Sequence, residues 1–168
     1  METPTDYKLK TLVTLLNRKI NREIPEINRG GCGIFAQMVY PKLVELGYKP
    51  KIMVFDREPD EFVDYIKSNL KKTINNQETD SGFNLESTSF AHCCLLIDNF
   101  AFDGLQKETD LLFNWTRLYN VFYYNYEELS VSLKFGGWCS IYDRDNSNPI
   151  MKRIINEAFE KTFIKHSL

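Results

Sequence analysis

Residues 90–105 read FAHCCLLIDNFAFDGL, two apolar segments joined by the polar pair Asp98–Asn99. Asp and Asn adopt the positive φ angles of a two-residue β-hairpin turn more readily than most residues do. The stretch therefore predicts two antiparallel strands, Phe90–Ile97 and Phe100–Leu105, connected by this turn.

The parity of this hairpin brings two chemically useful side chains together. A two-residue turn pairs Ile97 with Phe100 and, further along, Cys94 with Asp103. Because side chains alternate along a strand, His92 and Asp103 then project from the same face as diagonal neighbours, within reach of an imidazole–carboxylate contact. A loop longer or shorter by one residue would send them to opposite faces. The set expected on the shared face is His92, Cys94, Leu96, Ala101, Asp103 and Leu105.

A second stretch, NRGGCGIFA at residues 28–36, places a glycine-flanked cysteine at the start of an apolar segment with helical spacing. We expect a helix that begins at Cys32 or Gly33, stops at Gly47 and kinks or breaks at Pro41. The first turn of a helix has unpaired N–H groups and a partial positive charge, and both stabilise a thiolate. Cys32 is therefore a candidate nucleophile with a lowered pKa.

Cysteine, histidine and acid follow one another along the chain as Cys32, His92 and Asp103. In an activated thiol nucleophile the thiolate attacks, a histidine moves protons and a carboxylate fixes the histidine tautomer. The other histidine, His166, is near the C-terminal end, where fraying is expected, so His92 is the candidate base. The structural alternatives are a core thiol for Cys32, a hydrogen-bonded strand residue for His92 and a strand end before a turn for Asp103.

The residues around Cys32 suggest how a substrate carbonyl would be bound. Gly31 and Gly33 keep side chains away from the sulfur, and the Cys32 N–H is the expected oxyanion donor. Asn28, four positions earlier, is a second candidate donor; its alternative role is that of a loop-capping asparagine.

The remaining cysteines do not form a metal-binding pattern. Cys93 and Cys94 are adjacent in a predicted strand and point to opposite faces, so one disulfide or one metal cannot readily use both. We expect both to be packing residues, with Cys94 on the His92 face. A zinc site built from Cys32, His92, Cys94 and Cys139 lacks a close ligand pair such as C-x₂-C, so we expect no metal and no cofactor.

Helical periodicity and short apolar runs predict the other elements of the chain. The segment Leu111–Tyr126 is rich in aromatic residues and is compatible with either a helix or a strand. The further expected elements are helices over Asp6–Asn21, Glu58–Thr73 and Glu127–Lys134 and from Asn148–Pro149 onwards, a strand over Lys51–Phe55, a polar loop over Asn75–Ser89, and a turn from Gly136 into a strand ending near Tyr142. The inward side of the Glu58–Thr73 helix is expected to carry Phe62, Tyr65, Ile66 and Leu70.

Length and composition favour one domain, residues 1–168, with its own hydrophobic core. The formal net charge is −2, without the basic excess typical of nucleic-acid-binding proteins. There is no apolar run of the roughly 18 residues that cross a bilayer, and the polar N-terminus does not resemble a secretion signal. The four cysteines show no disulfide framework. These features predict a cytoplasmic protein that acts neither on nucleic acid nor on membranes.

The two stretches together resemble the papain-like superfamily in its broad sense, which includes the transglutaminase-like and other small thiol-protease branches. The resemblance covers about residues 28–104. It is carried by the motif Gly30-Gly31-Cys32-Gly33-x-Phe35-Ala36 with its following helix, by Ala91-His92 in a strand, and by Phe102-Asp103-Gly104 in the next. It implies an α+β fold in which a central helix carrying the nucleophile packs on an antiparallel sheet.

The same resemblance implies Cys32 as nucleophile, His92 as general base and acid, and Asp103 as the residue that orients the histidine. Glu26 stands where papain itself has a glutamine that helps bind the oxyanion. The C-terminal third of the chain matches no motif of this superfamily.

We therefore expect a cysteine-nucleophile hydrolase, a peptidase or amidase that acts on a protein or peptide through a thioester intermediate. Two alternatives remain open at this stage. One is acyl transfer to an amine, as in a transglutaminase or acyltransferase. The other is a catalytically inactive protein-binding module on the same scaffold, with the aromatic segment 113–126 and the loop 75–89 as its binding surface. The oligomeric state is not predicted.

Overall fold

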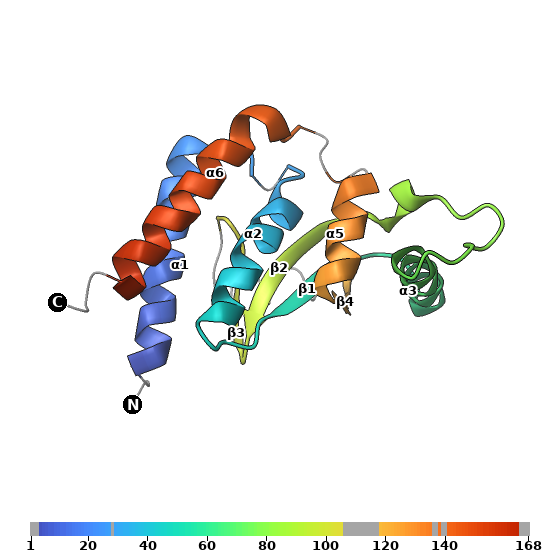
Figure 1. Ribbon diagram of the computed structural model, residues 1–168, viewed down its shortest axis with the longest axis horizontal. Coiled ribbons are helices and arrows are strands. Elements are labelled where there is room, and N and C mark those ends of the chain that lie inside the picture. Colours follow the sequence, from blue (N-terminus) through green and yellow to red (C-terminus); the bar gives the residue numbers. More distant parts are fainter. Residues whose placement is uncertain (1–3, 28, 106–117, 136–137, 139–140, 165–168) are drawn as a thin grey trace.

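A four-stranded antiparallel sheet with the strand order β3-β2-β1-β4 lies at the centre of this α+β structure (Figure 1). The computed structural model of the chain describes residues 4–27, 29–105, 118–135, 138 and 141–164. The strands are β1 (Lys51–Asp56), β2 (His92–Ile97), β3 (Phe100–Phe102) and β4 (Asn120–Tyr124). The helices are α1 (Pro4–Glu23), α2 (Cys32–Glu45), α3 (Asp60–Ile74), α5 (Tyr126–Phe135) and α6 (Arg144–Phe159), with a 3₁₀ turn, η1 (Leu85–Thr88), and a π-helical turn, η2 (Glu160–Ile164).

The hairpin of β2 and β3 has the predicted register. Ile97 pairs with Phe100 and Leu95 with Phe102, and Asp98 has the positive φ of 52° that the two-residue turn requires. The strand β3 is shorter than predicted, because the ladder stops at the Leu95–Phe102 pair. The part of β2 before Leu95 therefore has its ladder partner on one side only, in β1.

Side chains alternate between the two faces of the sheet as predicted. Cys93 belongs to the main hydrophobic core, which lies on the face covered by α2. Cys94 belongs to a separate cluster on the reverse face. The opposite orientations expected of this adjacent pair are confirmed. The buried residues of the reverse-face cluster are Met53, Phe55, Cys94, Leu96 and Ala101.

The helix α2 begins at Cys32, as predicted, and packs against β2. Its Phe35 ring meets the Phe102 ring edge-on, with the ring centroids 6.3 Å apart and the planes at 86°. Of the kink or break predicted at Pro41, the break is wrong, because the helix continues to Glu45; the kink stays a prediction. A proline removes a single backbone hydrogen bond, and the packing of the apolar side chains on either side of it stabilises the helix.

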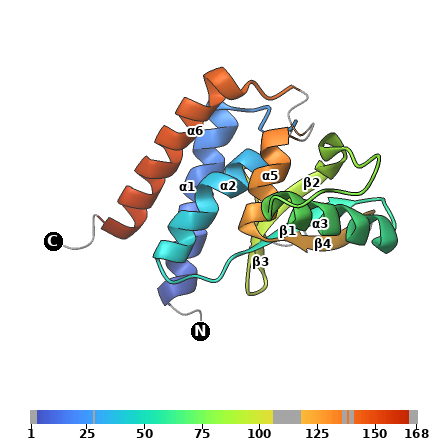
Figure 2. The same ribbon diagram turned by 45° about the vertical axis from the view of Figure 1, so that its right-hand side comes forward.

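The helices α1 and α6 lie side by side and pack against one another beyond α2 (Figures 1 and 2). The predicted start of the last helix at Asn148–Pro149 is wrong, since α6 begins at Arg144. The carboxylate of Asp143 caps this earlier start by accepting hydrogen bonds from the N–H groups of Asp145 (3.1 Å) and Asn146 (3.2 Å). An Asp cap satisfies two N–H groups, whereas a proline is only accommodated at the first helical position and satisfies none. Pro149 therefore lies inside α6 and does not mark its start.

The helix α3 lies against α5 at the other end of the sheet. Its predicted inward face is correct at Ile66 and Leu70 but wrong at Tyr65, which is 37 % exposed. Asn69 is buried in its place, because Asp80 of the following loop satisfies its side-chain amide. The Asn69 Nδ2 group donates to Asp80 Oδ2 (3.0 Å), and Asn69 Oδ1 accepts the N–H of Asp80 (2.8 Å). A polar side chain is thus inward where it is hydrogen-bonded to the loop.

The C-terminal part is described only in places. The predicted helix Glu127–Lys134 corresponds to α5, and β4 occupies the end of the ambiguous segment Leu111–Tyr126, of which residues 111–117 lie outside the described residues. The predicted turn at 136–139 lies largely outside them as well, and Ile141 and Tyr142 are not in a strand.

In the described ranges, no helix is both long and apolar enough to cross a membrane.

Candidate active site

Cys32 is the first residue of α2 and is 2 % exposed. The preceding residue, Gly31, forms the N-terminal boundary of the helix, and its carbonyl accepts the N–H of Phe35 at 2.9 Å. The sulfur thus lies at the end of the helix where the peptide dipoles place partial positive charge. This environment favours the thiolate over the thiol.

His92 and Asp103 form a buried hydrogen-bonded pair. The distance from His92 Nε2 to Asp103 Oδ2 is 2.7 Å, and the two side chains are 1 % and 0 % exposed. The other carboxylate oxygen, Oδ1, accepts the N–H of Leu105 at 2.7 Å. Each oxygen of Asp103 therefore has a donor, which fixes the position of the carboxylate relative to the imidazole.

The backbone around Asp103 is held by the first helix. The side-chain amide of Asn17, in α1, is placed to donate to the carbonyl of Asp103 (2.8 Å) and to that of Gly104 (3.2 Å). Gly104 packs tightly against Ile27, since a Cβ at this glycine would lie 3.0 Å from Cγ1 of that residue. The turn that carries the acid is thus fixed by contacts from two segments distant in sequence.

The short length of β3 explains how one imidazole reaches both of its partners. His92 pairs with Phe55 of β1, and the two rings stack with centroids 6.1 Å apart and planes at 27°. On its other side the strand β2 has no ladder with β3 at this level, because that ladder ends at Leu95. The imidazole at this open edge bonds Asp103, beyond the end of β3, and also Cys32, at the start of α2.

Two side chains of β2 favour the ionised form of Cys32. Bonds from the Cys93 thiol and from the His92 imidazole, together with the positive charge of protonated His92, hold the pKa of Cys32 well below its usual value of 9.0. Burial opposes this shift, because it disfavours the charged form. The donors outweigh burial, so this environment favours the thiolate over the thiol.

The pKa of His92 shifts in the opposite direction to that of Cys32. Burial lowers the pKa of His92, but the negative charge of Cys32 and the hydrogen bonds to Asp103 and Cys32 outweigh it and raise the pKa to about 10. Both shifts favour the form in which a thiolate lies beside an imidazolium ion. This is the protonation state in which a thiol is nucleophilic and a proton is available for a leaving group.

Cys93 is the residue that the sequence analysis missed. We expected it to be a packing residue, and expected Cys94 to be the cysteine on the histidine face. Cys94 does lie on the expected face, in the reverse-face cluster with Phe55, the strand partner of His92. Cys93 instead faces α2, where it lowers the pKa of Cys32. Strand alternation predicts that Cys93 faces away from Cys94, but the sequence does not show that α2 covers the face to which Cys93 points.

The two glycines beside Cys32 are sites of close packing. A Cβ on Gly31 would lie 2.6 Å from the carbonyl oxygen of Ile27 and 2.7 Å from the Tyr142 ring. A Cβ on Gly33 would lie 2.8 Å from Cδ2 of Leu133 in α5. The N–H of Gly31 donates to the Ile27 carbonyl at 2.6 Å, so it is already engaged. Asn28, the other predicted oxyanion donor, lies outside the described residues.

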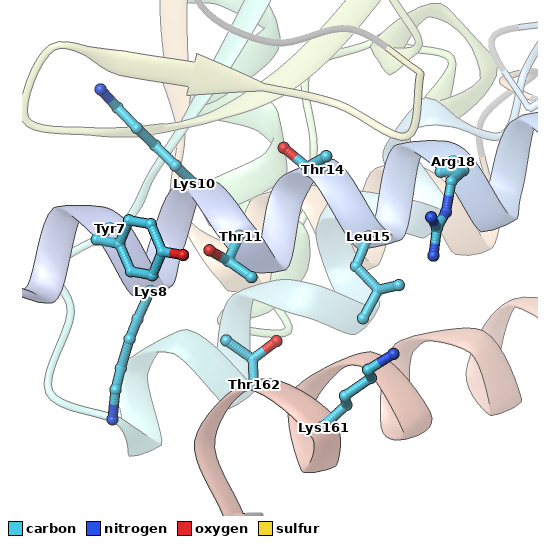
Figure 3. A pocket seen from close by; sticks show the side chains of 9 residues that line it. All are labelled: Tyr7, Lys8, Lys10, Thr11, Thr14, Leu15, Arg18, Lys161 and Thr162. Carbon is cyan, nitrogen blue, oxygen red and sulfur yellow. The ribbon is translucent and has the colours of Figure 1, made fainter. Parts of the chain in front are cut away.

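A surface groove lies away from the candidate catalytic residues. It is a groove of about 820 Å³ along α1 and η2, which includes the basic residues Lys8, Lys10, Arg18 and Lys161 (Figure 3). Cys32, His92 and Asp103 do not line it. All three side chains are almost fully buried.

Within the described ranges, no cluster of His, Cys, Asp and Glu side chains is arranged to bind a metal ion. Cys139, one of the four residues weighed for a zinc site, lies outside these ranges. Comparisons with models of protein families, with curated proteins and with solved structures found no match for this chain.

Proposed function

We propose that the chain is a cysteine-nucleophile hydrolase that cleaves an amide or peptide bond through Cys32, His92 and Asp103. The observation that carries the proposal is the buried His92–Asp103 hydrogen bond of 2.7 Å, next to a Cys32 whose negative charge raises the pKa of the same imidazole. Three positions far apart in the sequence meet in a buried site, in the order that thiol-based acyl transfer requires.

The first half of the reaction is acylation. The Cys32 thiolate forms a bond to the substrate carbonyl carbon, and the carbonyl electron pair moves onto oxygen. Backbone N–H groups at the start of α2 are the nearest donors for that oxyanion. The oxyanion then collapses, the C–N bond breaks, and the imidazolium of His92 gives its proton to the departing amine. The products are a thioester on Cys32 and a neutral imidazole.

The second half is deacylation. Neutral His92 removes a proton from water as the water oxygen attacks the thioester carbonyl. The C–S bond breaks, the acid product leaves, and the thiolate–imidazolium pair is restored. An amine in place of water completes the same cycle as a transferase. The nucleophile used in this step distinguishes the two enzyme classes.

Asp103 has a positioning role in this scheme. Its carboxylate bonds Nε2 of His92, which leaves Nδ1 as the nitrogen that serves the sulfur and the leaving group. It also stabilises the imidazolium form, which is present in the resting enzyme and after water is activated. Asp103 accepts no proton during the cycle.

We also propose that the fold is a small variant of the papain-like one. Three features support this: the nucleophile at the start of a helix, the packing of that helix on an antiparallel sheet, and a histidine on β2 paired with an acid just beyond the end of the adjacent strand β3. The substrate class that follows is a protein or peptide, with action in the cytoplasm and on neither nucleic acid nor membranes.

The proposal is tested by trapping the acyl-enzyme. Incubation with an activated acyl ester is expected to add one acyl group, located on Cys32 by intact-mass and peptide mass spectrometry. Cys32→Ala is expected to fold and remain unmodified, whereas Cys94→Ala, which removes a buried thiol behind the sheet, is expected to react like the wild type. Release of the acyl group as acid indicates a hydrolase, and its transfer to added amine indicates a transferase. A folded wild type that is never acylated on Cys32 would support the non-catalytic binding module instead.

A further inference from the structure

The thiol of Cys93 lies behind the candidate nucleophile. Strand alternation directs its side chain onto the face of the sheet covered by α2, and it is fully buried there. The α2 helix packs on β2 at this level, and Cys32 belongs to the same core cluster. The Cys93 thiol is the largest influence on the pKa of Cys32, which it lowers as a hydrogen-bonding neighbour.

Packing alone does not require a cysteine at this position. The neighbouring residue that faces the same core, Leu95, is aliphatic, and an aliphatic side chain would equally fill the interior of a buried strand. A thiol adds one feature that an aliphatic side chain lacks, which is a hydrogen-bond donor. A thiolate removed from water is stabilised by each donor that replaces its hydration.

Among the residues that the structure describes, few other charged groups act on the sulfur. From β2, the titratable residues that face Cys32 are His92 and Cys93, and Asp103 acts through His92. Cys94 lies on the reverse face of the sheet. The side chains of α5 that meet the glycine after Cys32 are Leu129 and Leu133, and the contacts on the preceding glycine come from Ile27 and Tyr142.

We propose that Cys93 is a positioning residue, whose thiol donates a hydrogen bond to the Cys32 sulfur and so keeps the nucleophile ionised and directed toward His92. This inference rests on the proposed function, since it assigns a second residue to the same nucleophile. Cys93 itself is not a second nucleophile. Its hydrogen bond to Cys32, its burial and the adjacent negative charge raise its own pKa well above the usual value, so it remains a thiol.

The role predicts a specific change in the pH profile. Without the donor, a larger fraction of Cys32 is protonated at low pH, so the acid limb of the acylation rate moves to higher pH. At high pH, where Cys32 is fully ionised in either protein, the rate is nearly unchanged, because a thiolate with a higher pKa is at least as nucleophilic. A residue that only fills space would change the rate at all pH values alike.

The experiment uses three variants of Cys93 and one control in the full-length chain. Cys93→Ala and Cys93→Val remove the donor, with Val retaining the bulk, and Cys93→Ser retains a donor. Cys94→Ala is the matched control, since it removes an equally buried thiol from the next position of the same strand. The titration of Cys32 is followed by the ultraviolet absorbance of the thiolate, as the difference from the same protein carrying Cys32→Ser.

We expect Cys93→Ala and Cys93→Val to raise the midpoint of the Cys32 titration by about one pH unit, which is the size of one hydrogen bond to an anion. We expect Cys93→Ser to stay within about half a unit of the wild type, and Cys94→Ala to match it. Thermal unfolding identifies any variant that does not fold, and the Val variant replaces the Ala variant in that case.

An unchanged midpoint in the folded Ala or Val variant would overturn the proposal, as would an equal shift in Cys94→Ala. The titration needs no substrate, so it is independent of the proposed function. A shifted midpoint without any acylation of Cys32 would leave the role of Cys93 standing and would exclude the hydrolase. Acylation of Cys32 with an unshifted midpoint would support the hydrolase and would overturn the role of Cys93.

Discussion

Nε2 of His92 and Oδ2 of Asp103 lie 2.7 Å apart, although eleven positions separate the residues and a tight turn lies between them. Both side chains are essentially inaccessible to solvent. A buried charge pair of this kind is costly to break, because removal of one partner leaves the other desolvated and uncompensated. The same hydrogen bond therefore contributes to the stability of the fold and orients the imidazole for the proposed chemistry.

Asp103→Asn is expected to decrease the rate of Cys32 acylation by about 10²- to 10⁴-fold. An amide has one acceptor oxygen where the carboxylate has two, so it cannot satisfy both the Leu105 N–H and the histidine. Loss of the negative charge also lowers the pKa of His92, which is measured from the histidine resonances by nuclear magnetic resonance (NMR).

The control for this variant is Asp98→Asn. Asp98 is an exposed carboxylate in the turn of the same hairpin, and asparagine tolerates its positive φ. It should acylate at the wild-type rate. Equal rates for Asp103→Asn and Asp98→Asn would show that Asp103 does not orient the imidazole.

The free energy of unfolding should depend on pH in a way set by the thiolate–imidazolium pair. The pKa of folded His92 is raised from 6.5 to about 10, so its contribution is complete below 6.5 and is lost as the pH rises through about 10. The pKa of folded Cys32 is lowered from 9.0, so its contribution is complete above 9.0 and is lost as the pH falls.

Between 6.5 and 9.0 the two slopes cancel, because folded and unfolded chains bind the same number of protons at this pair. We expect urea unfolding to show a level contribution in this interval and a decrease on either side of it. The contribution is isolated as the difference between the wild type and a Cys32→Ser/His92→Gln double variant. A difference that does not vary with pH would contradict the ion pair.

The glycines flanking Cys32 are expected to differ in their tolerance of alanine. Gly31→Ala places a Cβ against a backbone carbonyl that cannot move alone, and should destabilise the protein by about 3 kcal/mol. Gly33→Ala meets only the flexible end of Leu133, and should cost about 1 kcal/mol. Urea unfolding measures both. A larger loss of stability in Gly33→Ala than in Gly31→Ala would contradict this expectation. It would mean that the Leu133 side chain cannot move to make room for the added methyl group.

Local patterns predicted much of the architecture. The turn Asp98–Asn99 determines the register of β2 and β3, and that register accounts for the meeting of His92 and Asp103. The glycine-flanked start of α2 was predictable for a similar reason, since helix ends depend on a few neighbouring residues. Short-range chemistry is visible in a sequence because the residues that decide it are adjacent.

Features that depend on long-range packing were not predictable in the same way. Tyr65 is exposed and Asn69 buried because a distant Asp80 satisfies the amide. The short length of β3, which lets the imidazole bond both of its partners, has no signal in the apolar run Phe100–Leu105. The role of Cys93 required knowing which helix covers which face of the sheet.

The protonation of His92 in the resting protein tests the central claim most directly. The chain has two histidines, so the NMR spectrum of the imidazole nitrogens is simple, and the variant His166→Asn assigns it. The account predicts that His92 is a doubly protonated imidazolium at neutral pH and titrates near 10, and that Cys32→Ser returns it toward its usual value. A His92 that is neutral at pH 7 and titrates near 6.5 irrespective of Cys32 would contradict the thiolate–imidazolium pair.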